Sequence, residues 1–203
     1  MKITAIDFET ANTARASACS VGLAVIENRK IIHTEERLIK PHRSCNYFDW
    51  RNVRIHGIQP EDVANEAEFP ELKDWLFELL DSDVVIAHNA AFDMSVLRAL
   101  CDLYGIEYPQ FKYLCTLRGS QKHWTDLPSH KLNDLCNTFG HTFAHHNACA
   151  DAEAAALLLL QMLDEADCKS PVEFANKYNI TLGTMTCNSY TPCSICKLKI
   201  KNS

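Results

Sequence analysis

The first forty residues of the chain alternate apolar runs with short polar breaks. Residues 1–10 are apolar and β-branched, and residues 19–27 and 31–39 repeat that pattern on either side of the polar break Asn28-Arg29-Lys30. Apolar runs of this length separated by a turn-like break are typical of strands joined in a hairpin. The pattern therefore predicts three strands, of which the second and third form an antiparallel hairpin.

The middle of the chain changes to helical spacing. The apolar residues between Leu72 and Leu80 recur at helical intervals, which predicts a helix within residues 68–82. Residues 83–87 (DVVIA) then form a short apolar run, the pattern of a strand buried on both faces. Asn89 is placed to cap a following helix from about Ala90 to Tyr104, which Gly105 ends.

The last third of the chain continues this alternation. It predicts a strand at residues 112–117, a short helix ending at Gly140, a long helix over residues 148–166 and a further helix starting at Ser170. Strands that come first as a hairpin and later alternate with helices predict an α/β fold, with a mixed sheet flanked by helices. Residues 181–203 lose all periodicity, so we expect a compact domain over residues 1–180 and a C-terminal tail after it.

Composition limits the class of protein. The chain has 203 residues, 47% of them hydrophobic, which is enough for one well-buried domain. Its longest apolar run, residues 154–160, is far shorter than a membrane span, and its first residues read as a strand and not as a secretory signal. Most of the ten cysteines stand singly in apolar segments. We therefore expect a cytoplasmic protein without membrane contact and with reduced thiols.

Charge is distributed unevenly. The net charge of −6 argues against a large non-specific surface for duplex nucleic acid. Two stretches, residues 40–57 and 112–131, nevertheless combine basic and aromatic side chains. Such a mixture can neutralise a few phosphates and stack on unpaired bases, but it is also typical of an ordinary solvated loop.

Four acidic residues in three separated segments are candidates for a shared site. Asp7 and Glu9 lie two apart on a predicted strand, so they share one face. Two carboxylates held about 4 Å apart repel each other by roughly 4 kcal/mol at an effective dielectric constant of 20, so a cation must offset them unless they lie at an exposed strand end. Asp93 falls in the first turn of the helix after residues 83–87, where an acid also suits the helix dipole.

The third segment is the head of the long helix. His146 precedes Asp151 by five residues, which fits a histidine in the entering loop and an acid in the opening turns. Either a local cap or a site explains this pair alone. Together, however, the four carboxylates suit two divalent ions, Mg²⁺ or Mn²⁺, of the kind that cleave phosphodiesters. His146 is then placed to take a proton from an attacking water.

Three motifs, DFET at residue 7, HNAAFD at residue 88 and HNACAD at residue 146, resemble the three motifs of the DEDDh (DnaQ-like) 3′-to-5′ exonucleases. This resemblance implies a ribonuclease H-like fold. It implies that Asp7 bridges two metal ions, that Glu9 and Asp151 help to hold the ion on the nucleophile side, and that Asp93 acts on the second ion. His146 would be the general base, whereas His145 lies outside the pattern.

The resemblance also implies how substrate binds. Thr10 matches the position whose backbone helps to fix the terminal nucleotide, and His56 belongs to an IHGI element beside the substrate channel. This raises the expectation that the basic and aromatic loop touches nucleic acid through Phe48, Arg51 and Arg54.

The implied substrates are single-stranded or frayed 3′ ends of nucleic acid, and a polymerase subunit is a possible partner. DNA is favoured over RNA, although no residue distinguishes them. The alternatives are an RNA-trimming exoribonuclease of the same family and a non-catalytic nucleic-acid-binding module.

The tail carries one more candidate site. Cys187, Cys193 and Cys196 include a Cys-x-x-Cys pair that could begin a zinc site. A structural zinc ion needs four ligands, however, and no second pair follows. The tail is therefore expected to be unstructured or loosely docked, with zinc binding as the alternative.

Overall fold

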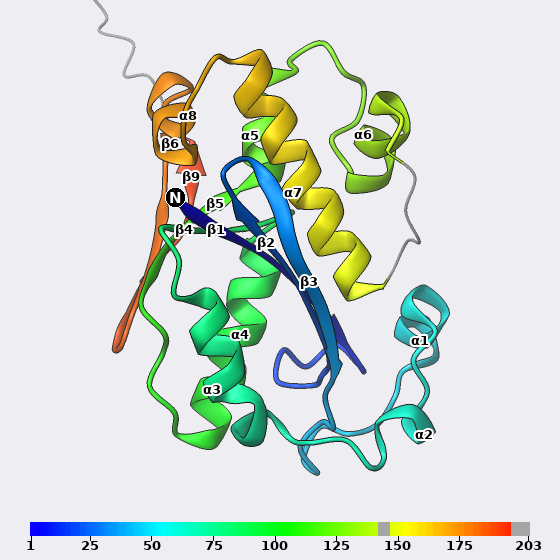
Figure 1. Cartoon of the computed structure of the whole chain (residues 1–203). Helices are drawn as coiled ribbons and strands as arrows, with labels where there is room; N and C mark the ends of the chain where they lie inside the picture. Colours follow the sequence, from blue (N-terminus) through cyan, green and yellow to red (C-terminus); the bar gives the residue numbers. More distant parts are fainter. Residues whose placement is uncertain (142–146, 196–203) are drawn as a thin grey trace, which may run out of the picture.

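The computed structural model describes residues 1–141 and 147–195 and shows one large sheet with helices on both faces (Figure 1). The strands of this sheet lie in the order β3-β2-β1-β4-β5-β7-β8. Their bounds are β1 (Lys2–Thr10), β2 (Ala18–Glu27), β3 (Lys30–Leu38), β4 (Val84–Ala87), β5 (Phe111–Cys115), β7 (Gly183–Thr186) and β8 (Ser189–Thr191). A second, two-stranded sheet pairs β6 (Ile180–Thr181) with β9 (Ser194–Ile195).

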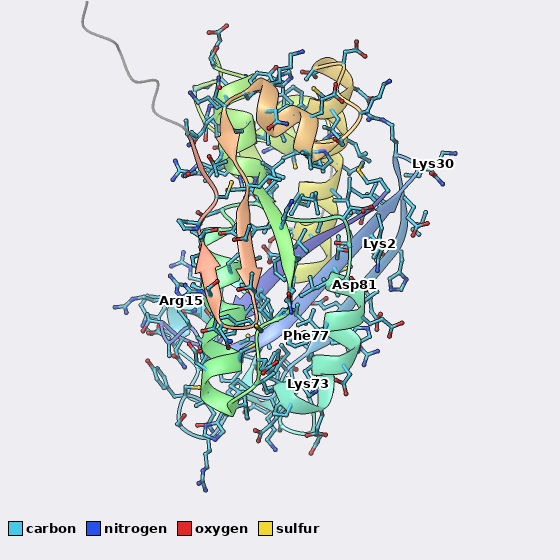
Figure 2. The ribbon with its side chains drawn as sticks, turned by 90° about the vertical axis from the view of Figure 1, so that its left-hand side faces the viewer. Lys2, Arg15, Lys30, Lys73, Phe77 and Asp81 are labelled. Atoms are coloured by element: carbon cyan, nitrogen blue, oxygen red, sulfur yellow. The ribbon has the colours of Figure 1, made fainter. Side chains whose placement is uncertain are left out.

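Helices precede and follow the inner strands. They are α1 (Trp50–His56), α2 (Pro60–Val63), α3 (Phe69–Leu80), α4 (Ala91–Tyr104), α5 (Thr116–His123), α6 (Leu132–Phe139), α7 (Ala148–Glu165) and α8 (Pro171–Lys177). Lys2 at the start of β1 donates hydrogen bonds to the backbone oxygens of Glu78 and Asp81 at the end of α3 (Figure 2). No helix in the described residues is both long enough and apolar enough to span a bilayer.

The sheet is mixed, as expected. β1 runs antiparallel to β2 and parallel to β4, and β2 and β3 form the predicted hairpin. Its turn holds Asn28 and Arg29 at φ angles of 50° and 63°, the left-handed pair that suits the twist of a tight hairpin. The predicted fold class, an α/β fold with a mixed sheet flanked by helices, is confirmed.

Alternate residues of β1 belong to two different hydrophobic clusters. Ile6 and Phe8 pack with the cluster that includes α3 and α4, whereas Ile3 and Ala5 pack with the cluster that includes α7. Because successive side chains of a strand point to opposite faces, Asp7 and Glu9 continue the series of Ile3 and Ala5. Both acids therefore lie on the face of the sheet that α7 covers.

The start of α7 lies directly on this face. A Cβ atom on Gly22 would stand 2.0 Å from the carbonyl carbon of Ala148, so only glycine permits this approach. Gly22 is the partner of Asp7 in the β1–β2 register. The missing side chain on β2 thus lets the first turn of α7 settle beside Asp7.

Several elements differ from the sequence expectations. The basic and aromatic stretch of residues 40–57 contains the short helix α1, the short helix α2 follows it, and α5 begins directly after β5. Asn89 does not cap α4. It adopts a φ angle of 66°, and the N-cap is Ala90, whose side chain cannot accept a hydrogen bond. Helices of one or two turns show too few apolar repeats to be read from spacing alone.

The chain after residue 180 differs most from expectation. β7 and β8, which follow that point, extend the large sheet from β5. Gly183 lies so close to the ring of Tyr113 that a Cβ atom would stand 2.0 Å from it, and the Arg98 guanidinium lies 4.1 Å from the ring centre of Tyr190. These strands have four and three residues, so their sequences carry no visible period, and tertiary contacts hold them in place.

Candidate active site

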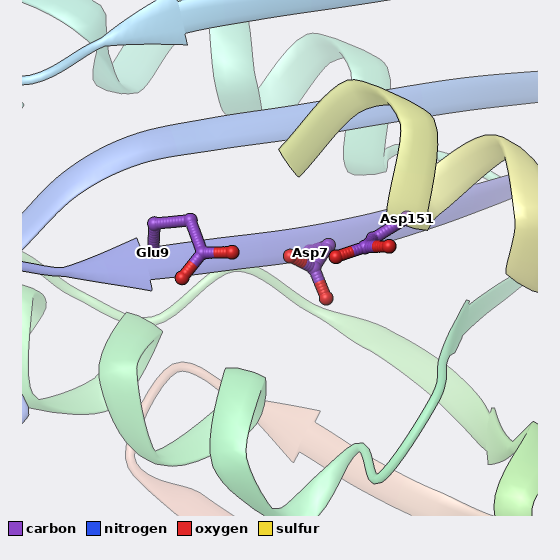
Figure 3. A group of neighbouring side chains, drawn as sticks. All are labelled: Asp7, Glu9 and Asp151. Atoms are coloured by element: carbon purple, nitrogen blue, oxygen red, sulfur yellow. The ribbon is translucent and has the colours of Figure 1, made fainter. Parts of the chain in front are cut away.

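Three carboxylates from two distant parts of the chain meet at the end of β1. Oxygen atoms of Asp7, Glu9 and Asp151 lie within 4.8 Å of one another (Figure 3). Asp7 and Glu9 come from β1, and Asp151 comes from the first turn of α7. The structure thus brings together three of the four predicted acids.

A hydrogen-bonded chain holds the start of α7 in this position. The Asn147 side chain accepts a hydrogen bond of 3.0 Å from the backbone N–H of Ala150 and donates another to Glu36 on β3. The second carboxylate oxygen of Glu36 accepts a hydrogen bond of 2.6 Å from the Ser20 hydroxyl. Glu36 therefore connects β2 and β3 to the cap of the helix that carries Asp151. No sequence motif indicates Glu36, because only the strand register places it opposite Gly22.

Asp93, the fourth acid, is buried beside this group. Its side chain is in the first turn of α4, and the residue is 1% exposed. One carboxylate oxygen accepts a hydrogen bond of 3.1 Å from the backbone N–H of Phe8. That N–H is available because the pairing of β1 with β4 ends at Ala5. The other oxygen, Oδ2, is buried and has no hydrogen-bond partner in the described part of the chain.

Burial and neighbouring charges raise the pKa values of Asp7, Glu9 and Asp93. Burial, followed by the charges of Asp93, Glu9 and Asp151, raises the pKa of Asp7 well above its usual range. Burial and the charge of Asp151 raise the pKa of Glu9 to about 8. Burial also raises the pKa of Asp93 to about 7, although the Phe8 N–H and Arg15 act to lower it. Without a cation, the site therefore holds protons near neutral pH.

The donor set fits divalent metal ions. Among the described residues, no lysine or arginine forms an ion pair with Asp7, Glu9 or Asp93. Carboxylate oxygens are the hard ligands that Mg²⁺ and Mn²⁺ prefer, and an unpartnered buried oxygen such as Asp93 Oδ2 lacks what a cation or its bound water would supply. The observed arrangement is thus one that a divalent cation would complete.

Two of the predicted substrate residues are tied to the end of β1. The Thr10 carbonyl oxygen accepts hydrogen bonds from Asn52 Nδ2, at 2.8 Å, and from His56 Nε2, at 3.2 Å. His56 Nδ1 accepts a hydrogen bond of 3.0 Å from the Ile58 N–H, so Nε2 carries the proton. His56 therefore fixes the backbone beside Glu9, and its role toward substrate stays a prediction.

Of the other predicted substrate-binding residues, one packs in a hydrophobic cluster and two are exposed. Phe48 packs against the small cluster of Ala11, Cys19 and Val63. Arg51 and Arg54 are exposed on α1. His146 lies outside the described residues, as does Cys196, so the general-base and zinc predictions stay predictions. The two described tail cysteines, Cys187 and Cys193, are free thiols of intermediate exposure.

The fold and the carboxylate group together define the class of protein as a DEDDh-type nuclease with a ribonuclease H-like fold. A family model described as exonuclease (RNase T) matches residues 4–159, so the chain belongs to this exonuclease family. The resemblance found in the three motifs is thereby confirmed.

Individual relatives agree with this family. The chain is 28% identical over 181 residues to the PolC-type DNA polymerase III of Bacillus subtilis (strain 168), a match that covers 87% of the chain but 12% of the polymerase. Exonuclease X in complex with 5′ overhanging duplex DNA has a TM-score of 0.70, 19% identity and coverage of 86% of this chain and 98% of its own. The nuclease domain of 3′hExo, a DEDDh family member bound to rAMP, also has a TM-score of 0.70, with 16% identity and coverage of 81% and 92%.

Proposed function

We propose that this protein is a metal-dependent 3′-to-5′ exonuclease that hydrolyses the terminal phosphodiester bond of a nucleic acid and releases 5′-nucleotides. The observation that carries this proposal is the group of Asp7, Glu9 and Asp151, whose oxygens lie within 4.8 Å of one another. Buried Asp93, with its unpartnered oxygen, completes the set.

The residues have distinct roles in this proposal. Asp7, Glu9 and Asp151 would hold the divalent ion on the nucleophile side, and Asp7 and Asp93 would hold the second ion. When bound, the ions supply charge stabilisation for the attacking and departing oxygens. His146 accepts the proton of the attacking water, a task suited to an imidazole whose ordinary pKa lies near neutrality. The Glu36–Asn147 contact holds the helix end from which Asp151 projects.

DNA is the favoured substrate, with a proofreading subunit or a free exonuclease as the setting. The similarity to a DNA polymerase and to a nuclease in complex with DNA supports this choice. The similarity to 3′hExo bound to rAMP supports an exoribonuclease as the second candidate. Both share the chemistry and differ in whether a 2′-hydroxyl is accepted.

The test is degradation of matched DNA and RNA strands, single- and double-stranded and labelled at the 5′ end, with Mg²⁺ or Mn²⁺. We expect stepwise shortening of the labelled strand with release of 5′-mononucleotides, faster for a single strand than for a blunt duplex. EDTA should abolish the reaction. Internal cleavage, or binding without any product, would contradict the proposal, and the ratio of the DNA and RNA rates selects between the two candidates.

A further inference from the structure

The short helix α1 presents an unusual outer face. At 3.6 residues per turn, positions 50, 51, 54 and 55 fall within roughly 140° of the helix circumference. All four residues are exposed, whereas Asn52, Val53 and His56 on the other side are partly buried. The α1 outer face therefore consists of Trp50, Arg51, Arg54 and Ile55.

Large apolar groups stand in the solvent on this face. Trp50 is 64% exposed and Ile55 is 53% exposed. The Arg51 side chain is 70% exposed, and its guanidinium carbon lies 5.3 Å from the centre of a Trp50 ring. Exposing a tryptophan to water is unfavourable unless something covers it, and aromatic surface of this kind is typical of binding sites.

The α1 outer face is anchored to the end of β1. The backbone N–H of Asp49, the N-cap of α1, donates a hydrogen bond of 2.8 Å to the Ala11 carbonyl oxygen. Asn52 and His56 both hydrogen-bond to the carbonyl oxygen of Thr10, the residue after Glu9. Figure 1 places α1 at the same end of the sheet as the start of α7. The α1 outer face therefore belongs to a helix that lies beside the end of the strand that carries Asp7 and Glu9.

We propose that the α1 outer face binds unpaired nucleotides of the substrate strand upstream of the scissile bond. Trp50 stacks on a base, Ile55 extends the apolar contact, and Arg51 and Arg54 contact phosphates. The inference rests on the proposed function, since it assigns this surface to the same substrate. The face carries two guanidinium groups, of which Arg51 lies 3.7 Å from the Asp49 carboxylate and Arg54 has no acid among the four face residues, so its net charge suits a polyanion. Stacking requires an unpaired base.

The first experiment compares Trp50→Ala with Trp50→Phe on two substrates, a DNA dinucleotide and a single-stranded DNA of ten nucleotides. The dinucleotide has only one nucleotide upstream of its single phosphodiester bond, whereas the longer strand has nine. We expect Trp50→Ala to raise KM for the longer strand roughly tenfold with kcat unchanged, and to leave the dinucleotide kinetics unchanged. Trp50→Phe should restore most of the loss. Ile32→Ala, a truncation of another exposed apolar residue, on β3, is the matched control.

The second experiment measures binding without hydrolysis. Titration of the wild-type protein with the longer strand in EDTA should quench tryptophan fluorescence, and Trp50→Phe should abolish most of that change. Arg51→Ala and Arg54→Ala should each lower the slope of log affinity against log salt by roughly 0.7, the value for one phosphate contact on a single strand. Lys30→Ala, at the opposite end of the sheet from the β1–β2 loop that holds Arg15 (Figure 2), should leave the slope unchanged.

The outcomes separate this inference from the proposed function. Equal effects of Trp50→Ala on both substrates, or no effect on either, would overturn the inference while leaving the exonuclease intact. Trp50-dependent binding by a protein that releases no nucleotide would overturn the proposed function alone. Salt slopes unchanged in Arg51→Ala and Arg54→Ala would assign the face to something other than the nucleic-acid backbone and would also overturn the inference.

Discussion

Acidic side chains at the two ends of α7 have different surroundings. At the C-terminal end, Glu165 accepts hydrogen bonds from Trp124 Nε1 at 2.7 Å, Gln161 Nε2 at 2.8 Å and His123 Nε2 at 2.9 Å. At the N-terminal end, Asp151 instead lies among other carboxylates. The same helix thus carries one acid satisfied by the chain and another crowded by like charges.

The pKa values of the acids near the two ends of α7 differ in the same way. Burial acts to raise the pKa of Glu165, but hydrogen bonds from Trp124, Gln161 and His123 hold it below its usual value. The pKa of Glu9, next to Asp151, is raised to about 8. Hydrogen bonds from its neighbours favour the charged form of an acid, whereas acids held close together have raised pKa values, which are typical of functional sites. This contrast is what marks the N-terminal end as the functional one.

The largest expected effect comes from removing one acid of the carboxylate group, compared with removing Glu165 at the other end of α7. Asp7→Asn and Asp151→Asn should each lower the exonuclease rate roughly 10³-fold or more, because each removes several kcal/mol of the cation binding that stabilises the transition state. Glu165→Gln should leave the rate unchanged and lower the free energy of unfolding by about 1–3 kcal/mol. The measurements are single-turnover rates and chemical denaturation. A rate loss in Glu165→Gln matching that of Asp7→Asn would break the comparison.

The histidines near the two ends should differ as well. His146→Ala should lower the rate roughly 10²- to 10⁴-fold by removing the general base, without unfolding the chain. His145→Ala is the matched control, because His145 lies outside the motif. His123→Gln should leave the rate unchanged, since His123 is already bonded to the Tyr178 hydroxyl and to Glu165. An unchanged rate in His146→Ala would contradict the base assignment.

The pH dependence of the free energy of unfolding should show whether the acids near the N-terminal end of α7 destabilise the metal-free protein. The pKa values of Glu9 and Asp93 are raised to about 8 and about 7. The folded state therefore holds protons that the unfolded state has already lost above about pH 4.5, and stability must fall as pH rises toward 8. We expect a loss on the order of a few kcal/mol in EDTA. Thermal melts should show Mg²⁺ or Mn²⁺ raising Tm more at pH 8 than at pH 5.

The direction of this slope is diagnostic. Asp7→Asn should flatten it, because removing a neighbouring charge lowers the proton affinity of the remaining acids. Glu165, whose pKa is lowered, contributes stability that is lost only as pH falls below about 4.5, so Glu165→Gln should leave the slope between pH 5 and 8 intact. A metal-free protein whose Tm rises steadily from pH 5 to pH 8 would contradict the electrostatic account of the site.

The smallest effect concerns the cap of α7. Asn147→Ala should lower the free energy of unfolding by about 1 kcal/mol and should also weaken metal binding, because Asn147 links Glu36 to the helix end that carries Asp151. Ser170→Ala removes the corresponding cap of α8, where the Ser170 hydroxyl accepts a 3.1 Å hydrogen bond from the Glu173 N–H. It should match the loss of stability with no change in metal affinity. Denaturation and Mn²⁺ titration together measure both quantities.

Sequence periodicity succeeded where elements are long or wholly apolar. The hairpin of β2 and β3, the buried β4 and the long helices α3, α4 and α7 lie within about two residues of their predicted ranges. Gly105 and Gly140 end their helices at φ angles of 64° and 75°, as a glycine after a helix predicts. Periodicity failed for α1 and for β7 and β8, because elements of three to seven residues depend on distant contacts.

The sequence by itself determined the residues of the site and their local placement. Period-two alternation put Asp7 and Glu9 on one face, and helical spacing put Asp93 and Asp151 in opening turns. Only the tertiary structure decided that Asp151 reaches Asp7, because that approach depends on the absent side chain of Gly22.

The tertiary structure also decided what surrounds the site. It placed Glu36 under the cap of α7, left Asp93 Oδ2 without a partner in the described residues, and turned Trp50 outward on a helix anchored to Thr10. None of these is a property of a residue and its sequence neighbours. Each follows from how strands and helices far apart in the chain pack against one another, which local periodicity does not encode.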